Sequence, residues 1–280
     1  MTAHESIVMK AVRDADLDRY LSALYAPEAK RGALFALYAF NAEISGIRDR
    51  TSEILAAEIR LQWWREVIDS GSERSADGHP VAEALLSAIT EFGLPRAAFE
   101  NYLEARMFDL FNDPMPSRGD LEGYCGETAS TIMQLAALVL DSTAAPKHPD
   151  LAGHAGCAQA ITGLLRLLPL HRARGQCFVP RDILAAAGTS PEEFIADHAE
   201  EAGVRAIDAT IALAREHLGK FSAAAAVIPE TLRPAFLPAA LTPAYLDGLL
   251  RKRGKALTET TDIAGWKRHW TLFRKAARGW

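Results

Sequence analysis

The sequence predicts an all-α protein, a single helical domain over residues 1–280. Ala occurs 51 times and Leu 33 times, whereas Val and Ile together occur 23 times, and this bias favours helix over sheet. Apolar residues recur at three- and four-residue steps, and no segment shows the period-two alternation of a strand. A hydrophobic content of 49% is sufficient for one large core.

The first predicted helical region runs from Ala26 to about Asp69 and divides near its middle. Apolar residues keep a helical period through both parts. Thr51 or Ser52 is the expected N-cap of the second part, with Glu53 in the turn that follows. The polar segment Gly71–Pro80 is expected to form a surface loop.

The rest of the chain is expected to consist of helices separated by short loops. Pro169 should kink or locally unwind the helix that contains it, because proline removes a backbone hydrogen bond. The stretch that holds Pro229, Pro234, Pro238 and Pro243 should break into short pieces. The predicted helices cover residues 80–92, 95–111, 119–141, 150–173, 180–187, 191–200, 203–226, 243–253 and 262–278, with loops at Asn112–Arg118, Thr143–Pro149 and Gly175–Pro180.

Composition and charge exclude several classes of protein. The formal net charge is −5, which argues against general binding to nucleic acid. No run of about 18 apolar residues predicts a transmembrane helix, and the charged N-terminus lacks the apolar region of a secretory signal. Cys125, Cys157 and Cys177 lack the spacing of a zinc site or a disulfide framework, which is typical of a reducing cytosol. We therefore expect a cytoplasmic protein.

One segment carries polar side chains at helical spacing. Tyr38, Asn41, Ser45 and Asp49 follow one another at three- and four-residue steps, so they share one helix face. This face is either the wall of a functional pocket or a polar stripe beside a buried one.

The segment Gly156–Pro180 brings basic residues to the end of a helix. His171 lies beside the helix face that carries Arg174, and Arg166 and Arg172 are close in sequence. Each arginine alone would interact favourably with the helix dipole, and a lone histidine is commonly structural. As a cluster, the arginines could receive a phosphate or an acidic partner.

These segments resemble the squalene/phytoene synthase family, all-α enzymes that join two prenyl diphosphates head to head. The resemblance covers Ala23–Pro180. Tyr25–Phe40 is similar to the segment before the family's first Asp-rich motif. Met107–Leu110, which contains Asp109, and Tyr124-Cys125 are similar to the middle of the family pattern. Gly156–Pro180 is similar to the family's second Asp-rich motif. The resemblance implies an isoprenoid-synthase-like helical bundle around a central cavity.

The chain departs from the family's first motif, which reads Arg-x-x-Asp-Asp-x-x-Asp. Ala42 stands at the Arg position, and Ser45 and Gly46 stand at the paired Asp positions. Asp49 is the one motif carboxylate that remains.

The second motif, Asn-x-x-Arg-Asp-x-x-Glu-Asp, is changed as well. Gly163 stands at the Asn position, Leu167 at the first Asp, and Leu170 and His171 at the Glu-Asp pair, whereas Arg166 is retained. In the family these carboxylates hold the magnesium ions that bind the diphosphates, and magnesium prefers oxygen ligands. We therefore predict no metal site and no cofactor, with magnesium required only if the chain is an active synthase.

The chain also resembles a branch of this family that lacks the same acidic residues. This branch contains the mitochondrial complex I assembly factor and its bacterial relatives, and it implies a role in the assembly or stability of a respiratory complex. The resemblance is carried by Ala39–Glu43, Ser52-Glu53, Glu58–Arg65, Ala158-Gln159, Leu165-Arg166 and Phe178–Ile183.

Four tryptophans are candidates for partner binding. Trp63 and Trp64 are neighbours on one helix, so they cannot face the same way, and one of them is expected in the core. Trp266 and Trp270 share a face of the basic C-terminal helix. This helix could contact an anionic membrane surface, or it could dock on the protein through its tryptophans.

The first hypothesis is a non-catalytic protein that acts in respiratory-complex assembly or binds a lipid or protein partner. The alternative is a magnesium-dependent prenyltransferase of the squalene or phytoene synthase type that uses farnesyl or geranylgeranyl diphosphate, and an isoprenoid carrier is a third hypothesis. The expected partners are a respiratory-complex subunit or an isoprenoid lipid, with peripheral contact at the inner membrane and no nucleic acid. The pocket candidates are Tyr38, Asn41, Ser45, Asp49, Asp109, Tyr124, Arg166, His171 and Arg174.

Overall fold

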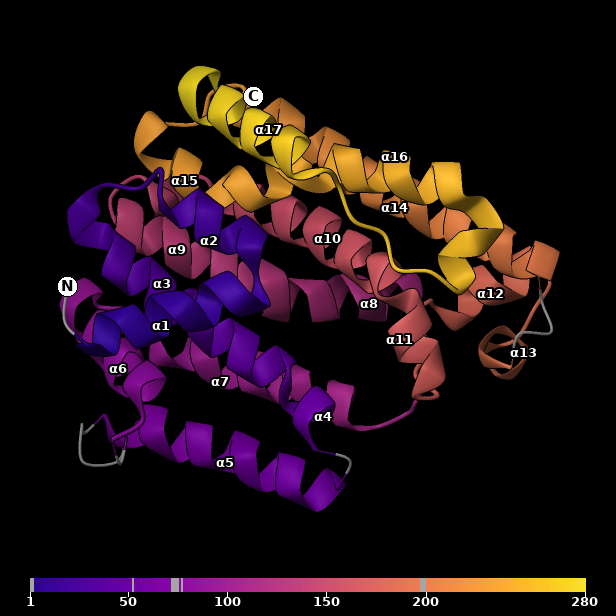
Figure 1. Ribbon diagram of the computed structural model, residues 1–280, viewed down its shortest axis with the longest axis horizontal. Coiled ribbons are helices and arrows are strands. Elements are labelled where there is room, and N and C mark those ends of the chain that lie inside the picture. The colour runs from indigo at the N-terminus through magenta and orange to yellow at the C-terminus, as the bar shows by residue number, and fades with distance from the viewer. Residues whose placement is uncertain (1–2, 52, 72–75, 77, 197–199) are drawn as a thin grey trace.

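The computed structural model is built from helices (Figure 1). It describes all residues except 1–2, 52, 72–75, 77 and 197–199. Within the described residues no strand occurs, so the predicted all-α class is confirmed. Helices from the first half of the chain form one edge of the molecule in Figure 1, and α14, α16 and α17 form the opposite edge.

Two helices precede the first predicted helical region. Asp16 separates them and caps the second, because its side chain accepts a hydrogen bond from the Arg19 backbone nitrogen at 2.9 Å. The elements of this half are α1 (Ala3–Ala15), α2 (Leu17–Ala23), α3 (Glu28–Ser45), α4 (Ile47–Arg50), α5 (Ile54–Ser70), α6 (Pro80–Phe92), α7 (Arg96–Arg106), the 3-10 turn η2 (Met107–Leu110), α8 (Arg118–Cys125), the π-helical turn η3 (Gly126–Ser130) and α9 (Thr131–Leu140).

The predicted N-cap at Thr51 is wrong. α5 begins at Ile54, and Glu53 occupies the N-cap position without a side-chain capping bond. Thr51 is extended, and its Oγ1 accepts a hydrogen bond from the Glu53 nitrogen at 3.3 Å. The hydroxyl therefore stabilises the turn before the helix instead of its first turn. The other predicted N-cap, Ser52, lies outside the described residues, as do residues 72–75 and 77 of the predicted loop Gly71–Pro80.

The long helix predicted over residues 150–173 is divided near Pro169, as expected. α10 (Pro149–Arg166) ends at Leu167, whose φ of −96° and ψ of 8° depart from helical values, and α11 (Leu168–Ala173) follows. Pro169 lies in the first turn of α11, where a backbone N–H would have no helical partner. The break directs residues of both helices into one cavity.

In the C-terminal half, one helix is shorter than the sequence predicts. The helix predicted over residues 191–200 ends early as α13, and residues 197–199 lie outside the described part of the chain. The remaining elements are the turn η4 (Ala145–Lys147), α12 (Arg181–Ala187), α13 (Pro191–Ile195), α14 (Glu200–Ala225), η5 (Glu230–Leu232), α15 (Arg233–Phe236), η6 (Leu237–Leu241), α16 (Thr242–Lys252), η7 (Arg253–Leu257) and α17 (Gly265–Arg278).

An aromatic cluster holds the N-terminal half together. The ring of Phe40 on α3 lies 5.1 Å from Trp64, 5.6 Å from Phe99 and 5.2 Å from Tyr102, measured between ring centres. All four side chains are at most 1% exposed. Such edge-on and tilted contacts add to the burial of apolar area. They fix α3 against α5 and α7.

In the C-terminal half, α10 packs along α14 and also crosses η3. The crossing is closest at Gly156, where an added Cβ would lie 2.4 Å from the backbone nitrogen of Ser130. Only glycine allows the two backbones to approach so closely. α10 thereby reaches the position from which it lines the cavity.

Candidate functional site

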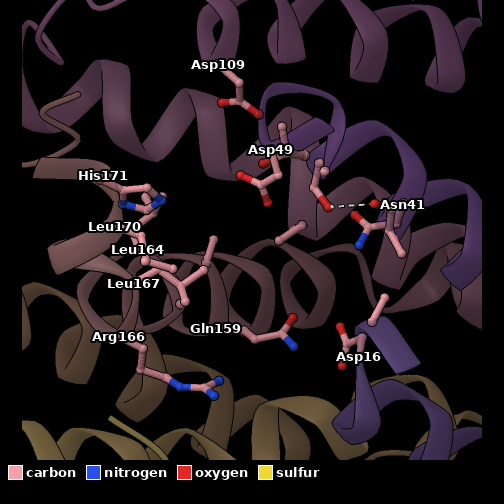
Figure 2. A pocket seen from close by; sticks show the side chains of 18 of the residues that line it. Asp16, Asn41, Asp49, Asp109, Gln159, Leu164, Arg166, Leu167, Leu170 and His171 are labelled. Carbon is pink, nitrogen blue, oxygen red and sulfur yellow. Dashed lines mark hydrogen bonds between the residues drawn. The ribbon is translucent and has the colours of Figure 1, made fainter. Parts of the chain in front are cut away.

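A cavity of about 720 Å³ lies between the two halves of the chain (Figure 2). Its walls come from α1–α4, the α7–η2 segment, α8, η3, α10, α11, α16, α17 and the segments around residues 176 and 262. This volume is in the range of small-molecule sites. Eight of the nine predicted pocket candidates line it: Asn41, Ser45, Asp49, Asp109, Tyr124, Arg166, His171 and Arg174.

The wall from α3 and α4 carries Asn41, Ser45 and Asp49. Asn41 is 6% exposed, and its Oδ1 accepts a hydrogen bond from the Tyr102 hydroxyl at 2.9 Å. That bond fixes the orientation of the amide at the inner end of the wall. Ser45 and Asp49 are more exposed and face the cavity one and two turns further along.

Tyr38 is a correction to the predicted pocket. Its side chain is 1% exposed, and it does not border the cavity. The guanidinium carbon of Arg19 lies 5.9 Å from the centre of the Tyr38 ring, and burial raises the pKa of the hydroxyl. Helical spacing places Tyr38 and Asn41 on one face, but it does not determine which neighbouring element covers that face.

Asp49, the remaining motif carboxylate, forms an ion pair with Arg174, which directly follows α11. The Asp49 side chain is 53% exposed and that of Arg174 is 34% exposed, so solvent screens the attraction. The consequence is a neutralised carboxylate at the cavity wall rather than a strong structural link.

The wall from α10 and α11 is apolar where the family has acidic residues. Figure 2 shows Leu164, Leu167, Leu170 and His171 together on one side of the cavity. Leu167 and Leu170 are 43% and 46% exposed, and both line the cavity. They present hydrocarbon to the cavity and offer no oxygen ligand.

His171 is a neutral part of this wall. Its ring lies 4.7 Å from the centre of the Phe178 ring, and its buried Nδ1 has no hydrogen-bond partner among the described residues. Burial and the nearby positive charge of Arg174 lower the pKa of His171 to about 4. The imidazole is therefore uncharged near neutral pH.

Asp109 is held in a closed network with Arg106 and Tyr124. Arg106 Nη1 donates to Asp109 Oδ2 at 2.9 Å and also to the Tyr124 hydroxyl at 2.9 Å. The Tyr124 hydroxyl in turn donates to Asp109 Oδ1 at 2.7 Å. The Gln176 amide donates to the Asp109 carbonyl at 2.8 Å and ties this network to the segment after α11. Burial raises the pKa of Tyr124, so it remains a proton donor.

A second charged network was missed by sequence reasoning. Asp18 lies 2.6 Å from Arg268 Nε and accepts a hydrogen bond from the Tyr245 hydroxyl at 2.6 Å, and Arg268 also pairs with Asp262 at 2.7 Å. The guanidinium of Arg166 stacks 3.6 Å from the centre of the Tyr245 ring. Asp14, Asp16 and Asp18 recur at two-residue steps, a signal that could have drawn attention to α1 and α2.

Each aspartate that lines the cavity is paired with a cation of the chain itself. Among the residues that the structure describes, no three His, Cys, Asp or Glu side chains gather so as to hold a metal ion. Magnesium is usually held by one or two carboxylates together with waters and substrate phosphates, and here every candidate carboxylate of the cavity already pairs with a cation, so this donor set fits it poorly. The pairs are Asp14–Lys10, Asp16–Arg19, Asp18–Arg268, Asp49–Arg174, Asp109–Arg106 and Asp262–Arg268.

The candidate tryptophans lie outside the cavity lining. Trp64 is 1% exposed and Trp63 is half-buried beside His79, with ring centres 5.2 Å apart, so the prediction that one of the pair lies in the core is confirmed. Trp266 and Trp270 are 74% and 59% exposed. Trp266 and Trp270 therefore do not dock the C-terminal helix, whereas Trp280, two residues beyond its end, packs against Phe221 with ring centres 5.2 Å apart.

Over the part of the chain that the structure describes, no helix has both the length and the apolar character needed to cross a membrane. Cys125, Cys157 and Cys177 are all buried free thiols.

The helical bundle has a cavity lined by residues from the positions of both Asp-rich motifs, among them Ser45, Asp49, Leu167 and Leu170, and this arrangement defines an isoprenoid-synthase-like fold. A dehydrosqualene synthase solved in complex with a ligand superposes with a TM-score of 0.82 at 17% identity, covering 98% of this chain and 95% of that one. A squalene synthase from Alicyclobacillus acidocaldarius superposes with a TM-score of 0.73 at 19% identity, covering 89% of this chain and 94% of that one. At these identities the likeness shows the fold alone.

The chain belongs to the squalene/phytoene synthase family, because the sequence model of that family matches residues 12–274. The complex I assembly factor 6 of Bos taurus is 30% identical over 240 residues, which is 85% of this chain and 71% of that protein. A presqualene diphosphate synthase of Sinorhizobium fredii is 28% identical over 184 residues, which is 64% of this chain and 65% of that protein.

Proposed function

We propose that this chain is a non-catalytic member of its family that acts in the assembly of a respiratory complex. The observation that carries the proposal is the pairing of every cavity aspartate with a lysine or an arginine of the chain. The similarity to complex I assembly factor 6 supports the assembly role. Peripheral contact with the inner membrane is part of the same proposal.

The chemistry of the cavity supports the non-catalytic part. Departure of a diphosphate from a prenyl group needs strong stabilisation of the leaving charge, which magnesium supplies in metal-dependent enzymes. Here the aspartates are neutralised from within, and Leu167 and Leu170 stand where two further acidic residues would be needed. We therefore expect no head-to-head condensation.

The cavity itself favours a second role, the binding of an isoprenoid lipid. Leu164, Leu167 and Leu170 supply an apolar wall, and Arg166 and Arg174 add guanidinium groups that already pair with aspartates of the chain. A ligand with an apolar chain and a polar head would match both surfaces, and an anionic head would have to compete with those aspartates.

The catalytic alternative is tested by incubating the pure protein with farnesyl or geranylgeranyl diphosphate, magnesium and a reductant. Products are read by mass spectrometry, with an Asp49→Ala variant as the control. The proposal expects no coupled hydrocarbon and no cyclopropyl intermediate from either protein. A coupled product that disappears in the variant would establish a prenyltransferase instead.

The assembly role is tested by deleting the gene in its own organism and measuring fully assembled complex I on native gels. The expected result is a loss of complex I at unchanged levels of ATP synthase, with recovery when the intact chain is expressed again. Normal complex I in the deletion strain would refute the role.

A further inference from the structure

The outer face of α17 carries an aromatic stripe. Trp266, Trp270 and Phe273 recur at helical steps and are 74%, 59% and 55% exposed, with the rings of Trp270 and Phe273 6.0 Å apart. The opposite face holds the buried residues Arg268 and Leu272, which attach the helix to the protein. Figure 1 shows α17 at the edge of the molecule.

This aromatic stripe is flanked by positive charge. The segment Gly265–Trp280 has five basic residues and no acidic residue in a chain of net charge −5, so the rest of the chain has a net charge of −10. Arg268 is used internally, in ion pairs with Asp18 and Asp262. Within the described residues, no ion pair links the other four to a carboxylate: Lys267, Arg274, Lys275 and Arg278.

We propose that the outer face of α17 docks on an anionic phospholipid bilayer. The three aromatic side chains would enter the boundary between headgroups and acyl chains, where tryptophan is favoured. Lys267, Arg274 and Arg278 would contact lipid phosphates, whereas Lys275 is partly buried and lies over the Trp280 ring. Exposed Lys and Arg beside a face of Trp and Phe are typical of helices that lie in a membrane surface.

A comparison with α5 separates this surface from ordinary exposed apolar residues. Leu55 and Ile59 are 69% and 62% exposed, so α5 also presents large apolar side chains to solvent. Its charges are mixed, with Glu53 and Glu58 beside Arg60. α5 therefore lacks the charge complementarity to an anionic surface that α17 has.

The inference deepens the peripheral membrane contact proposed above, and it does not depend on the chemistry of the cavity. Arg268 lines the cavity from the inner face of α17, so the membrane surface and the cavity would share one helix. The two proposals can therefore fail separately. A chain that does not bind vesicles can still act in complex assembly, and a deletion strain with normal complex I would not contradict vesicle binding.

The test is flotation of the full chain with two kinds of vesicle, phosphatidylcholine alone and phosphatidylcholine with about 30 mol% phosphatidylglycerol. We expect binding to the anionic vesicles only, weakening as salt is raised because salt screens surface charge. The Arg274→Glu/Arg278→Glu variant should bind at least about 25-fold more weakly, since each cation near an anionic surface contributes about fivefold. The Trp266→Ser/Trp270→Ser variant should bind at least about tenfold more weakly.

Matched controls carry the same chemical changes elsewhere on the surface. Leu55→Ser/Ile59→Ser removes exposed apolar groups from α5, and Arg251→Glu/Lys255→Glu reverses two exposed charges. Both controls should bind like the unaltered chain, and circular dichroism verifies that each variant is folded.

A second readout is the quenching of tryptophan fluorescence by brominated acyl chains. Quenching that is lost in Trp266→Ser/Trp270→Ser would support the insertion of α17. Equal binding to both kinds of vesicle, equal losses in the matched controls, or capture of an acidic protein without any vesicle binding would overturn the proposal.

Discussion

The close approach of α10 to η3 at Gly156 predicts a large loss of stability on Gly156→Ala. The new Cβ would lie 2.2 Å from Ser130 Oγ and 2.4 Å from the Ser130 nitrogen and Cα. Ordinary contacts begin near 3.4 Å, so the helices would have to separate by about 1 Å, and neither backbone atom can rotate away. Forced overpacking of this kind costs about 1–3 kcal/mol, and the backbone obstacle indicates the upper end.

The substitution also has a favourable component, because alanine stabilises a helix interior by about 1 kcal/mol relative to glycine. The net expectation is a loss of about 2 kcal/mol, or a fall in Tm of about 4–8 °C. Gly153→Ala on the same helix is the matched control, because nothing lies within 4 Å of its added Cβ. It should gain up to about 1 kcal/mol.

Both variants are compared by urea unfolding followed with far-ultraviolet circular dichroism. A Gly156→Ala protein as stable as Gly153→Ala would refute the claim that backbone contact at Ser130 sets the position of α10. Because α10 carries part of the cavity wall, Gly156→Ala should also weaken the binding of any cavity ligand more than Gly153→Ala does.

Three further outcomes are expected, each read from urea midpoints. Arg268→Met should lower the free energy of unfolding by about 3 kcal/mol, because Asp18, which is 13% exposed, loses its closest cation. Adding Asp18→Asn should recover part of that stability. Fully additive losses for the two substitutions would contradict the pairing. His171, whose pKa is lowered to about 4, binds a proton more weakly in the folded chain than in the unfolded chain. As the pH falls from about 6.5 to 4, about 3 kcal/mol of stability should therefore be lost. The His171→Phe variant should lose less stability over the same pH range. Trp64→Ala should cost about 3–5 kcal/mol and Trp63→Ala clearly less, since only Trp64 is fully buried; equal costs would argue against this placement.

Under the proposed non-catalytic role, the ion pairs of the cavity explain how a scaffold of this family would persist without a metal. Removing acidic residues alone would leave the remaining buried carboxylates without a counter-charge, which is costly. In this chain a cation of the protein accompanies each cavity aspartate, so the buried ones would need no external ion to balance their charge. The arginine pairs of Asp18 and Asp109 are the clearest cases, because both carboxylates are 13–14% exposed.

The sequence by itself determined the helical class, the division of the chain at Pro169, and the loss of acidic groups at Ser45, Leu167 and Leu170. These follow from local properties: helix propensity, the missing N–H of proline, and side-chain chemistry at spaced positions. Periodicity also placed Asn41 and Asp49 on one face.

Only the tertiary structure decided which groups meet. It buried Tyr38 behind Arg19, although the helical spacing of Tyr38 matches that of Asn41. It brought Asp18 against Arg268 across 250 residues of sequence, a pairing that no local pattern encodes. It also turned Trp266 outward, because the buried face of α17 carries Leu272, which packs in the core, and Arg268, which pairs with Asp18 of α2.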